Sequence, residues 1–281
     1  MNARQRQPDL PKLEVLAVAD ILLHERHDAQ RSAPLLDRLA QEGVLKNPPI
    51  VALIPGESRY VVLDGANRVT ALRELDIPHV VAQVVDYEDP ELELDTWHHL
   101  LRGMSGAALR TLLAESAGLA VEASELTHAR ALLARREVLA FVQFPGGAVL
   151  ALRAAGDLHA RTASLNALVD GYKSAGRIFR ANTDHLGELL PLYDDIAGLV
   201  VFPRFVPAEI IDLARVGACL PAGITRHLIP RRALRLNLPL EVLGSPDTLA
   251  QKNAWLGQWM RDKLANRTAR YYQESTFLFD E

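Results

Sequence analysis

Residues Asp64 to Arg68 lie where an apolar run changes into a helical pattern. Val61 to Leu63 is apolar, Asp64-Gly65 interrupts it, and Arg68 to Leu75 has helical spacing. A glycine turn that leads into a helix leaves backbone N–H groups unpaired at the positive end of the helix dipole, which suits a phosphate. Asp64 could bind a metal or cap the helix, and Arg68 could bind an anion. A capped turn without a ligand explains the same residues.

Two further polar segments complete a set of groups suited to phosphoryl transfer. His24-Glu25 follows the first apolar segment and supplies a carboxylate base, and Thr225-Arg226-His227 supplies a hydroxyl, a guanidinium and an imidazole. Phosphoryl transfer depends mainly on positioning and on neutralising charge, so these groups together suit it. Taken alone, each segment is also explained as a surface carboxylate or a polar loop. The hypothesis therefore requires the fold to bring the three segments together.

Length and composition favour two domains and argue against several classes of partner. The chain has 281 residues, 49% of them hydrophobic, with 31 basic and 35 acidic residues and a net charge of -4. That charge lacks the basic excess typical of nucleic-acid-binding proteins, although a local patch stays open. Cys219 is the only cysteine and is interpreted as a small buried side chain. The N-terminal charges precede no apolar run, and none approaches membrane-spanning length, so we expect a cytoplasmic protein without a membrane partner.

Strand and helix patterns alternate along the first third of the chain and predict an α/β unit. The predicted helices lie between Pro34 and Gly43 and over 68–75, and the predicted strands cover 13–23, 49–54, 60–63 and 79–85. The acidic residues from Asp86 to Asp95 are interpreted as a solvated loop and edge. Arg231, Arg232 and Arg235 are interpreted as a solvated face.

The second part of the chain predicts a further α+β unit. Residues 103–136 indicate a helical connector, and Pro145-Gly146-Gly147 between apolar runs indicates a hairpin. Further helices are predicted over 158–172, 186–196 and 208–216, and strands over 177–181 and 198–202. Trp255 and Trp259 lie on a predicted amphipathic helix over 250–269. They are interpreted as packing residues in the same chain or in a partner, which leaves a homodimer open.

The order of these segments resembles the free L-serine kinases built on the ParB/sulfiredoxin fold. The resemblance spans about residues 13–242, and its matching segments are His24-Glu25, Val62 to Arg68, Val84 to Tyr87, Trp97 and Ile224 to Pro230. It implies an α/β (α+β) protein with a ParB/sulfiredoxin-like first domain, a smaller α+β second domain and a C-terminal helix. The expected parts are a nucleotide-binding domain over 1–102, a connector over 103–136, a substrate-side domain over 137–243, and a helix with its tail over 244–281.

The resemblance also implies an activity and the residues that perform it. The activity is a nucleotide-dependent kinase that phosphorylates the hydroxyl of a free amino acid, L-serine above all, with ADP or ATP and Mg²⁺. Glu25 would take the proton of the serine hydroxyl, and Asp64 would lie at the reacting phosphate or the magnesium. The residues expected to line the nucleotide phosphates are Gly65, Ala66, Asn67 and Arg68. Those expected on the serine side are Trp97, Thr225, Arg226 and His227, with Arg226 a partner for the substrate carboxylate.

The turn itself departs from the family pattern. The kinases usually read Asp-Gly-His-His-Arg there, whereas Ala66 and Asn67 stand in place of the two histidines. Asn67 can form hydrogen bonds but carries no charge, and Ala66 offers neither. Either the chain holds its phosphoryl acceptor differently, or it has lost kinase activity and kept ligand binding.

Two other classes of protein compete with the kinase. The first is a ParB-like nucleotide-binding protein that regulates DNA partition or transcription, but the predicted second half contains strands where such proteins continue into a helix-turn-helix. The second is a sulfiredoxin-like reductase, whose chemistry needs a cysteine beside the phosphate turn. Cys219 is distant in sequence from Asp64, so that motif is absent.

Overall fold

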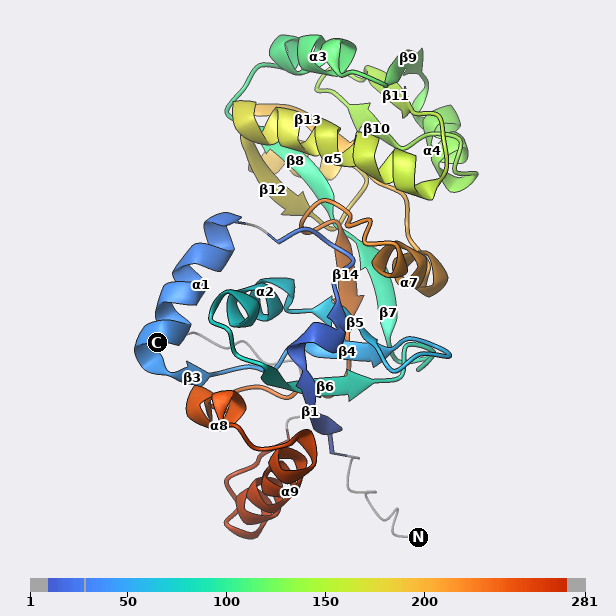
Figure 1. The fold of residues 1–281 in the computed structure, drawn as a ribbon. Helices are drawn as coiled ribbons and strands as arrows, with labels where there is room; N and C mark the ends of the chain where they lie inside the picture. The colour runs from blue at the N-terminus through green and yellow to red at the C-terminus, as the bar shows by residue number, and fades with distance from the viewer. Residues whose placement is uncertain (1–9, 28, 272–281) are drawn as a thin grey trace, which may run out of the picture.

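The computed structural model describes residues 10–27 and 29–271, and it contains two main sheets, each with its own helices (Figure 1). Residues 1–9, 28 and 272–281 lie outside the described residues, and with them the ends of the predicted first and last parts. Among the described helices, none has both the length and the apolar character that crossing a membrane requires.

The first sheet has five strands in the order β1-β6-β4-β5-β2. Their bounds are β1 Leu13–Ala17, β2 Ile21–Leu22, β4 Ile50–Leu53, β5 Tyr60–Asp64 and β6 His79–Val85, with a short 3-10 turn over Val18–Asp20. Val51 and Val62 belong to one buried cluster and Val61 and Leu63 to another. Since successive strand residues point to opposite faces, this sheet is buried on both sides, which explains its nearly continuous apolar runs.

Two helices pack against each other beside this sheet, and both were predicted. They are α1 Ala29–Glu42 and α2 Ala66–Glu74, and α2 starts two residues earlier than its sequence pattern indicated. Val69 and Leu72 of α2 are fully buried in the same cluster as Val62 of β5. The strand and the helix that follows it therefore share one core, which fixes the direction in which α2 starts.

The C-terminal elements return to the first sheet. Strand β15 (Leu238–Pro239) pairs with β3 (Val44–Leu45), and α8 (Leu240–Gly244) and α9 (Leu249–Ala265) follow it. Trp255 and Trp259 of α9 pack against the cluster that contains Val15 of β1. The two tryptophans thus pack within this chain, and they give no specific support to the homodimer that the sequence left open.

The second sheet has six strands in the order β12-β8-β13-β10-β11-β9. The strands are β8 His98–Arg102, β9 Ala120–Ser124, β10 Ala140–Gln143, β11 Val149–Arg153, β12 Arg177–Ala181 and β13 Ile196–Val201. The helices are α3 Gly106–Glu115, α4 Leu126–Ala134, α5 Leu158–Ala175, α6 Leu186–Leu189 with a 3-10 turn over Leu190–Leu192, and α7 Pro207–Arg215. The predicted hairpin is confirmed by the antiparallel pairing of β10 with β11.

The strand pairing divides the chain differently from the expected parts. Strand β8 was placed in the first domain by the boundary at residue 102, yet it pairs with β12 and β13 inside the second sheet. Strand β9 lies within the expected helical connector and pairs with β11. The segments 98–102 and 120–124 thus belong to the second sheet, because their hydrogen-bonded partner strands β11, β12 and β13 all lie in it.

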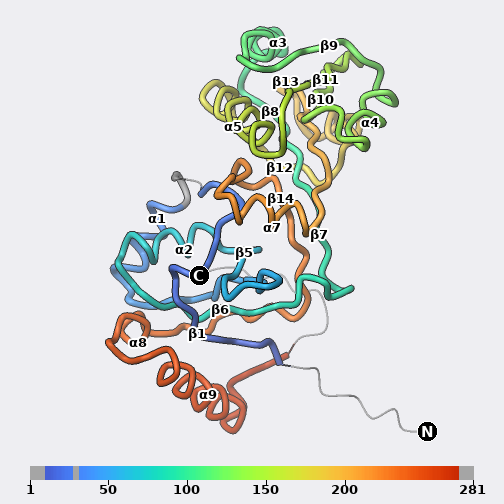
Figure 2. Tube along the Cα trace, turned by 45° about the vertical axis from the view of Figure 1, so that its right-hand side comes forward, coloured from blue at the N-terminus to red at the C-terminus, as the bar shows by residue number. Residues whose placement is uncertain are grey.

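A two-stranded ribbon lies between the two sheets (Figures 1 and 2). It is formed by β7 (Glu93–Thr96) and β14 (Thr225–Leu228), which are antiparallel with Thr225 opposite Thr96 and Arg226 opposite Asp95. The sequence analysis interpreted the acidic segment as a solvated loop and edge and left a polar loop open for residues 225–227, and it predicted neither strand. The two segments contain too few apolar residues to show a strand pattern. They pair with each other although they lie about 130 residues apart in the sequence.

Lys252 offers a test of how α9 is fixed to the first sheet. Its side chain is 1% exposed, and Nζ donates to Leu243 O at 2.6 Å, to Ser245 O at 2.8 Å and to His79 Nδ1 at 2.8 Å. We expect Lys252→Met to lower the free energy of unfolding by about 2 kcal/mol, because it leaves buried carbonyl groups without donors. Urea denaturation measures this change in the free energy of unfolding, with Lys263→Met on the exposed face of α9 as the matched control. Equal losses in both variants would contradict this role for Lys252.

Candidate functional site

A cleft of about 550 Å³ lies between the two sheets and collects the three predicted segments. It is lined by the end of β2, the turn between β5 and α2, strand β14 and the loop before it. All ten residues singled out from the sequence line it: Glu25, Asp64, Gly65, Ala66, Asn67, Arg68, Trp97, Thr225, Arg226 and His227. The spatial condition of the phosphoryl-transfer hypothesis is therefore met.

The turn between β5 and α2 has the backbone that a phosphate site needs. Gly65 has φ of +103°, a conformation that strains residues with a side chain, and α2 begins at the next residue. No side chain caps the start of α2 by a hydrogen bond. Ala66 and Asn67 line the cleft, so the positive end of the α2 dipole opens into it.

Two arginines surround the carboxylate of Asp64. Arg232 contacts Asp64 Oδ2 directly, and Arg68 Nη2 lies 3.4 Å from the same oxygen. Arg68 also donates to the carbonyls of Asn47 at 3.1 Å and Pro48 at 2.5 Å, and burial lowers its pKa to about 10, which still leaves it charged at neutral pH. Asp64 thus holds two cations at the start of α2.

Glu25 is held by backbone and side-chain donors from the other side of the cleft. Its Oε1 accepts from Thr225 N at 2.6 Å and from Thr225 Oγ1 at 2.6 Å, and its Oε2 accepts from Gly223 N at 2.9 Å. Backbone bonds between Arg26 N and Leu220 O and between Leu220 N and His24 O support this contact. Oε2 has one donor and so retains capacity to accept a proton from a ligand in the cleft.

Buried histidines support both walls of the cleft. His24 Nδ1 donates to Val62 O at 2.6 Å, and its Nε2 lies 2.9 Å from Thr225 Oγ1. His227 Nε2 lies 2.8 Å from the hydroxyl of Tyr87. Desolvation by burial lowers the pKa of His24 and lowers that of His227 to about 3. Both rings are therefore neutral near pH 7, and His227 acts here as a buried support rather than as a charged group.

Trp97 and Arg226 form a flat, charged wall at one end of the ribbon. The guanidinium carbon of Arg226 lies 4.4 Å from the ring centroid of Trp97, and Arg226 Nη1 lies 3.8 Å from Asp95 Oδ2. Such stacking fixes the plane of a guanidinium, which suits two-point binding of a carboxylate. Trp97 is thus part of the cleft and not only a core residue.

Sequence reasoning missed several residues that line the cleft, namely Arg26, Asn47, Arg180 and Arg232. Arg232 was interpreted as part of a solvated face, but the loop after β14 carries it to Asp64. Arg180 comes from β12, and its guanidinium occupies the space that a β-carbon at Gly223 would need. Arg26 directly follows Glu25, whereas no local motif marks Arg180 and Arg232, because strand pairing brings them to the cleft.

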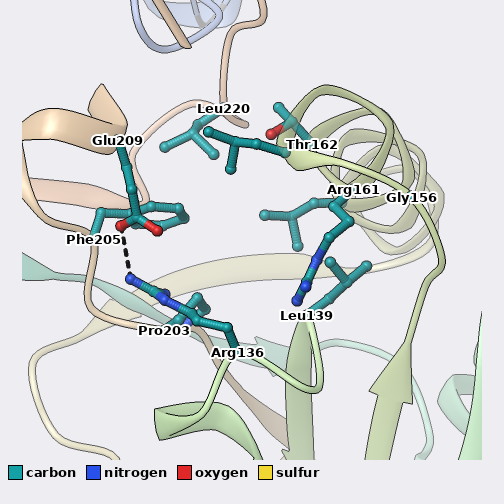
Figure 3. A pocket seen from close by; sticks show the side chains of 11 residues that line it. Arg136, Leu139, Gly156, Arg161, Thr162, Pro203, Phe205, Glu209 and Leu220 are labelled. Carbon is teal, nitrogen blue, oxygen red and sulfur yellow. Dashed lines mark hydrogen bonds and ion pairs between the residues drawn. The ribbon is translucent and has the colours of Figure 1, made fainter. Parts of the chain in front are cut away.

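Figure 3 shows a second, smaller cavity of about 170 Å³ that shares no lining residue with the cleft. Leu139, Leu165 and Phe205 give it apolar walls, and Arg136 bonds to Glu209 at 2.7 Å beside it. None of the ten predicted residues lines it, so the chemistry discussed here concerns the larger cleft.

Comparison of the sequence with known proteins finds relatives of a single kind. No protein-family model matches. An ATP-dependent L-serine kinase of Staphylothermus marinus is 34% identical over 101 residues, which cover 36% of this chain and 40% of that protein. The ATP-dependent L-serine kinase SbnI of Staphylococcus aureus is 25% identical over 273 residues, covering 96% and 97%. The ADP-dependent L-serine kinase SerK of Thermococcus kodakarensis is 24% identical over 226 residues, covering 78% and 88%.

Solved structures share the fold along most of the chain. A free serine kinase in complex with AMP has a TM-score of 0.72 at 16% identity and covers 86% of this chain and 98% of its own. The chain is therefore similar to L-serine kinases in sequence and to a free serine kinase in fold. C-terminally truncated SbnI from Staphylococcus aureus has a TM-score of 0.68 at 22% identity and covers 92% and 97%. The chain therefore shares the fold of these structures over both of its units, although it spans only 40% of the first of the sequence relatives.

The residues of the cleft fit a magnesium ion that would be shared with a bound phosphate. Mg²⁺ takes oxygen ligands and is usually bound by one or two carboxylates together with substrate phosphates and water. Asp64, at the turn before α2, would supply such a carboxylate through Oδ1, since Arg68 and Arg232 both contact its Oδ2. Within residues 10–27 and 29–271, no group of three or more His, Cys, Asp or Glu side chains could hold a metal by itself. The donor set therefore suits a shared ion and not a dedicated protein site.

The buried histidines predict how stability depends on pH. Desolvation lowers the pKa of His98 to about 4 and the pKa values of His99 and His227 to about 3, below the ordinary value of 6.5. Unfolding frees these rings to bind protons, so stability falls as the pH is lowered from about 6.5 towards 4, by roughly 1 kcal/mol per pH unit for each ring. Urea denaturation at several pH values measures the slope. His99→Gln should reduce the slope of the free energy of unfolding against pH by the contribution of one ring. The control, His159→Gln at an exposed position, should keep the wild-type slope. An unchanged slope in His99→Gln would be inconsistent with a neutral buried ring.

Proposed function

We propose that this chain is a nucleotide-dependent kinase that converts free L-serine to O-phospho-L-serine. The observation that carries the proposal is one cleft that places the Glu25 carboxylate opposite the start of α2 and its two arginines. The names of the sequence relatives support serine as the acceptor and ATP or ADP as the donor. A cytoplasmic enzyme with a ParB/sulfiredoxin-like first unit and a need for Mg²⁺ is part of the same proposal.

Glu25 is the proposed base. The serine hydroxyl gives its proton to Oε2 of Glu25, the serine oxygen forms a bond to the terminal phosphorus, and the bond from that phosphorus to the nucleotide oxygen breaks. The Gly223 and Thr225 donors fix the carboxylate in one orientation, so that little rearrangement is needed at the moment of transfer.

The nucleotide phosphates would lie at the start of α2. The backbone N–H groups of its first turn, together with Arg68 and Arg232, would neutralise the charge of the phosphoryl group being transferred. The replacement of two family histidines by Ala66 and Asn67 removes imidazoles but leaves these backbone groups in place. The departure in the motif is therefore compatible with phosphate binding at this turn.

Free serine would lie against Trp97, Thr225 and Arg226, with Arg226 the proposed partner of its carboxylate. His227 is assigned a positioning role for this wall, because it is buried against Tyr87 and neutral. Asp64 is the residue that would hold Mg²⁺, and the ion would neutralise part of the phosphate charge. The second sheet and its helices give no specific support to the DNA-partition alternative.

The activity itself is tested with the purified full chain, Mg²⁺, ADP or ATP, and a panel of free amino acids. We expect mass spectrometry to detect O-phosphoserine from serine, and Glu25→Gln to lower turnover at least 100-fold, on the order expected for losing a general base. Nucleotide binding without any phosphorylated product would contradict the kinase and favour the regulatory alternative. Unchanged turnover in Glu25→Gln would show that another group is the base.

The two neighbouring arginines after β14 provide a matched pair. Arg232 contacts Asp64 in the cleft, whereas Arg231 pairs with Asp89 and Glu91. We expect Arg232→Met to raise the KM for the nucleotide about tenfold or more, because it removes a charged partner of the phosphates. Arg231→Met should leave steady-state kinetics close to those of the wild type. Equal effects of the two substitutions would remove Arg232 from the proposed phosphate site.

A further inference from the structure

His24, Thr225 and Glu25 form a chain of contacts in which one hydroxyl proton faces two acceptors. Thr225 Oγ1 lies 2.6 Å from Glu25 Oε1 and 2.9 Å from His24 Nε2. A hydroxyl has a single proton to donate. Its direction therefore depends on which of the two acceptors is stronger.

The tautomer of His24 follows from its other contact. Nδ1 lies 2.6 Å from Val62 O, which can only accept, so Nδ1 carries the ring proton. His24 is 2% exposed, and burial lowers its pKa, so the ring is neutral near pH 7. Nε2 is therefore a lone pair directed at the Thr225 hydroxyl.

The charge on Glu25 decides between the two acceptors. An ionised carboxylate is the stronger acceptor, so the hydroxyl points to Oε1 while Glu25 is a free base. Once Oε2 has received a proton, Oε1 is part of a neutral carboxylic acid, and the imidazole nitrogen becomes the better acceptor. We propose that His24 acts through this hydroxyl as a positioning residue that stabilises protonated Glu25 and so raises its strength as a base. This inference rests on the proposed function of Glu25.

Other charged and titratable groups lie near the His24–Thr225–Glu25 contacts and affect the electrostatic potential there. His227 from β14 lies edge-on to His24 with 5.5 Å between ring centroids, and its low pKa keeps it neutral. Arg26 and Arg180 line the same cleft, and Cys219 Sγ lies 3.5 Å from Leu23 O behind it. None of these groups stands between Thr225 and either of its two acceptors, so substitutions at His24 act on Glu25 chiefly through the hydroxyl.

The test compares the wild type with His24 variants by the acid limb of the pH profile of kcat/KM. This limb reports the ionisation of the base in the free enzyme. Without an acceptor at position 24, the hydroxyl donates to Glu25 permanently and favours its charged form. We expect His24→Met to shift the limb to lower pH by about half to one unit and to lower kcat roughly three- to tenfold, the effect of one hydrogen bond. His24→Gln keeps an oxygen acceptor and should stay closer to the wild type. An unmoved limb in His24→Met would overturn the inference.

A double substitution separates this role from simple packing. In a Thr225→Val background there is no hydroxyl, so adding His24→Met should not shift the limb further. A shift of equal size in both backgrounds would mean that His24 acts by another route and would overturn the proposal. Serine phosphorylation by the wild type is the condition for these assays, and its failure would count against the proposed function instead.

A measurement on the wild-type chain keeps the inference testable if the substituted proteins do not fold. Nitrogen-15 NMR of the histidine side chains should show His24 as the neutral tautomer with its proton on Nδ1 between about pH 6 and pH 8. Detection of the Nε2–H tautomer, or of a charged ring in that range, would overturn the proposal, because no lone pair would then face Thr225.

Discussion

The contact between Glu25 and the Gly223–Thr225 segment is the interaction on which the rest of the cleft depends. Three donors from that segment bind the two carboxylate oxygens, and backbone bonds between Leu220 and the neighbours of Glu25 run beside them. Glu25 lies at the edge of the first sheet, while the segment leads into the ribbon between the sheets. The same contact that joins the two units therefore also orients the proposed base, so folding and catalysis share one set of hydrogen bonds.

Charge in the cleft differs in sign from charge in the chain as a whole. The net charge of the sequence is -4, yet the lining residues include five arginines and two carboxylates. A cleft of excess positive charge attracts phosphates and is neutralised when they bind. The neutral buried histidines behind it add donors and acceptors without adding charge. The arrangement suits a nucleotide, although the overall composition gives no sign of an anionic ligand.

Sequence patterns predicted much of this fold because they depend on local spacing. The strand over 79–85 and the hairpin around Pro145 were predicted from alternation and turn residues alone, and both are confirmed. The Asp64–Arg68 turn was found from glycine and helix start signals. Strands β7 and β14 and Arg232 were missed, since their positions depend on partners more than a hundred residues away, and Arg180 was missed because β12 pairs with β8, about 80 residues away. The resemblance to the serine kinases supplied what local rules could not, namely that the separated segments meet.

The central claim is that one cleft holds nucleotide and serine between the start of α2 and Glu25. A crystal structure of the full chain with ADP and serine tests it most directly. The account predicts density for the ADP phosphates at the N–H groups of Ala66 and Asn67, with the serine hydroxyl within hydrogen-bond distance of Glu25 Oε2. Phosphates bound elsewhere, or a serine hydroxyl turned away from Glu25 in a cleft that contains both ligands, would contradict it.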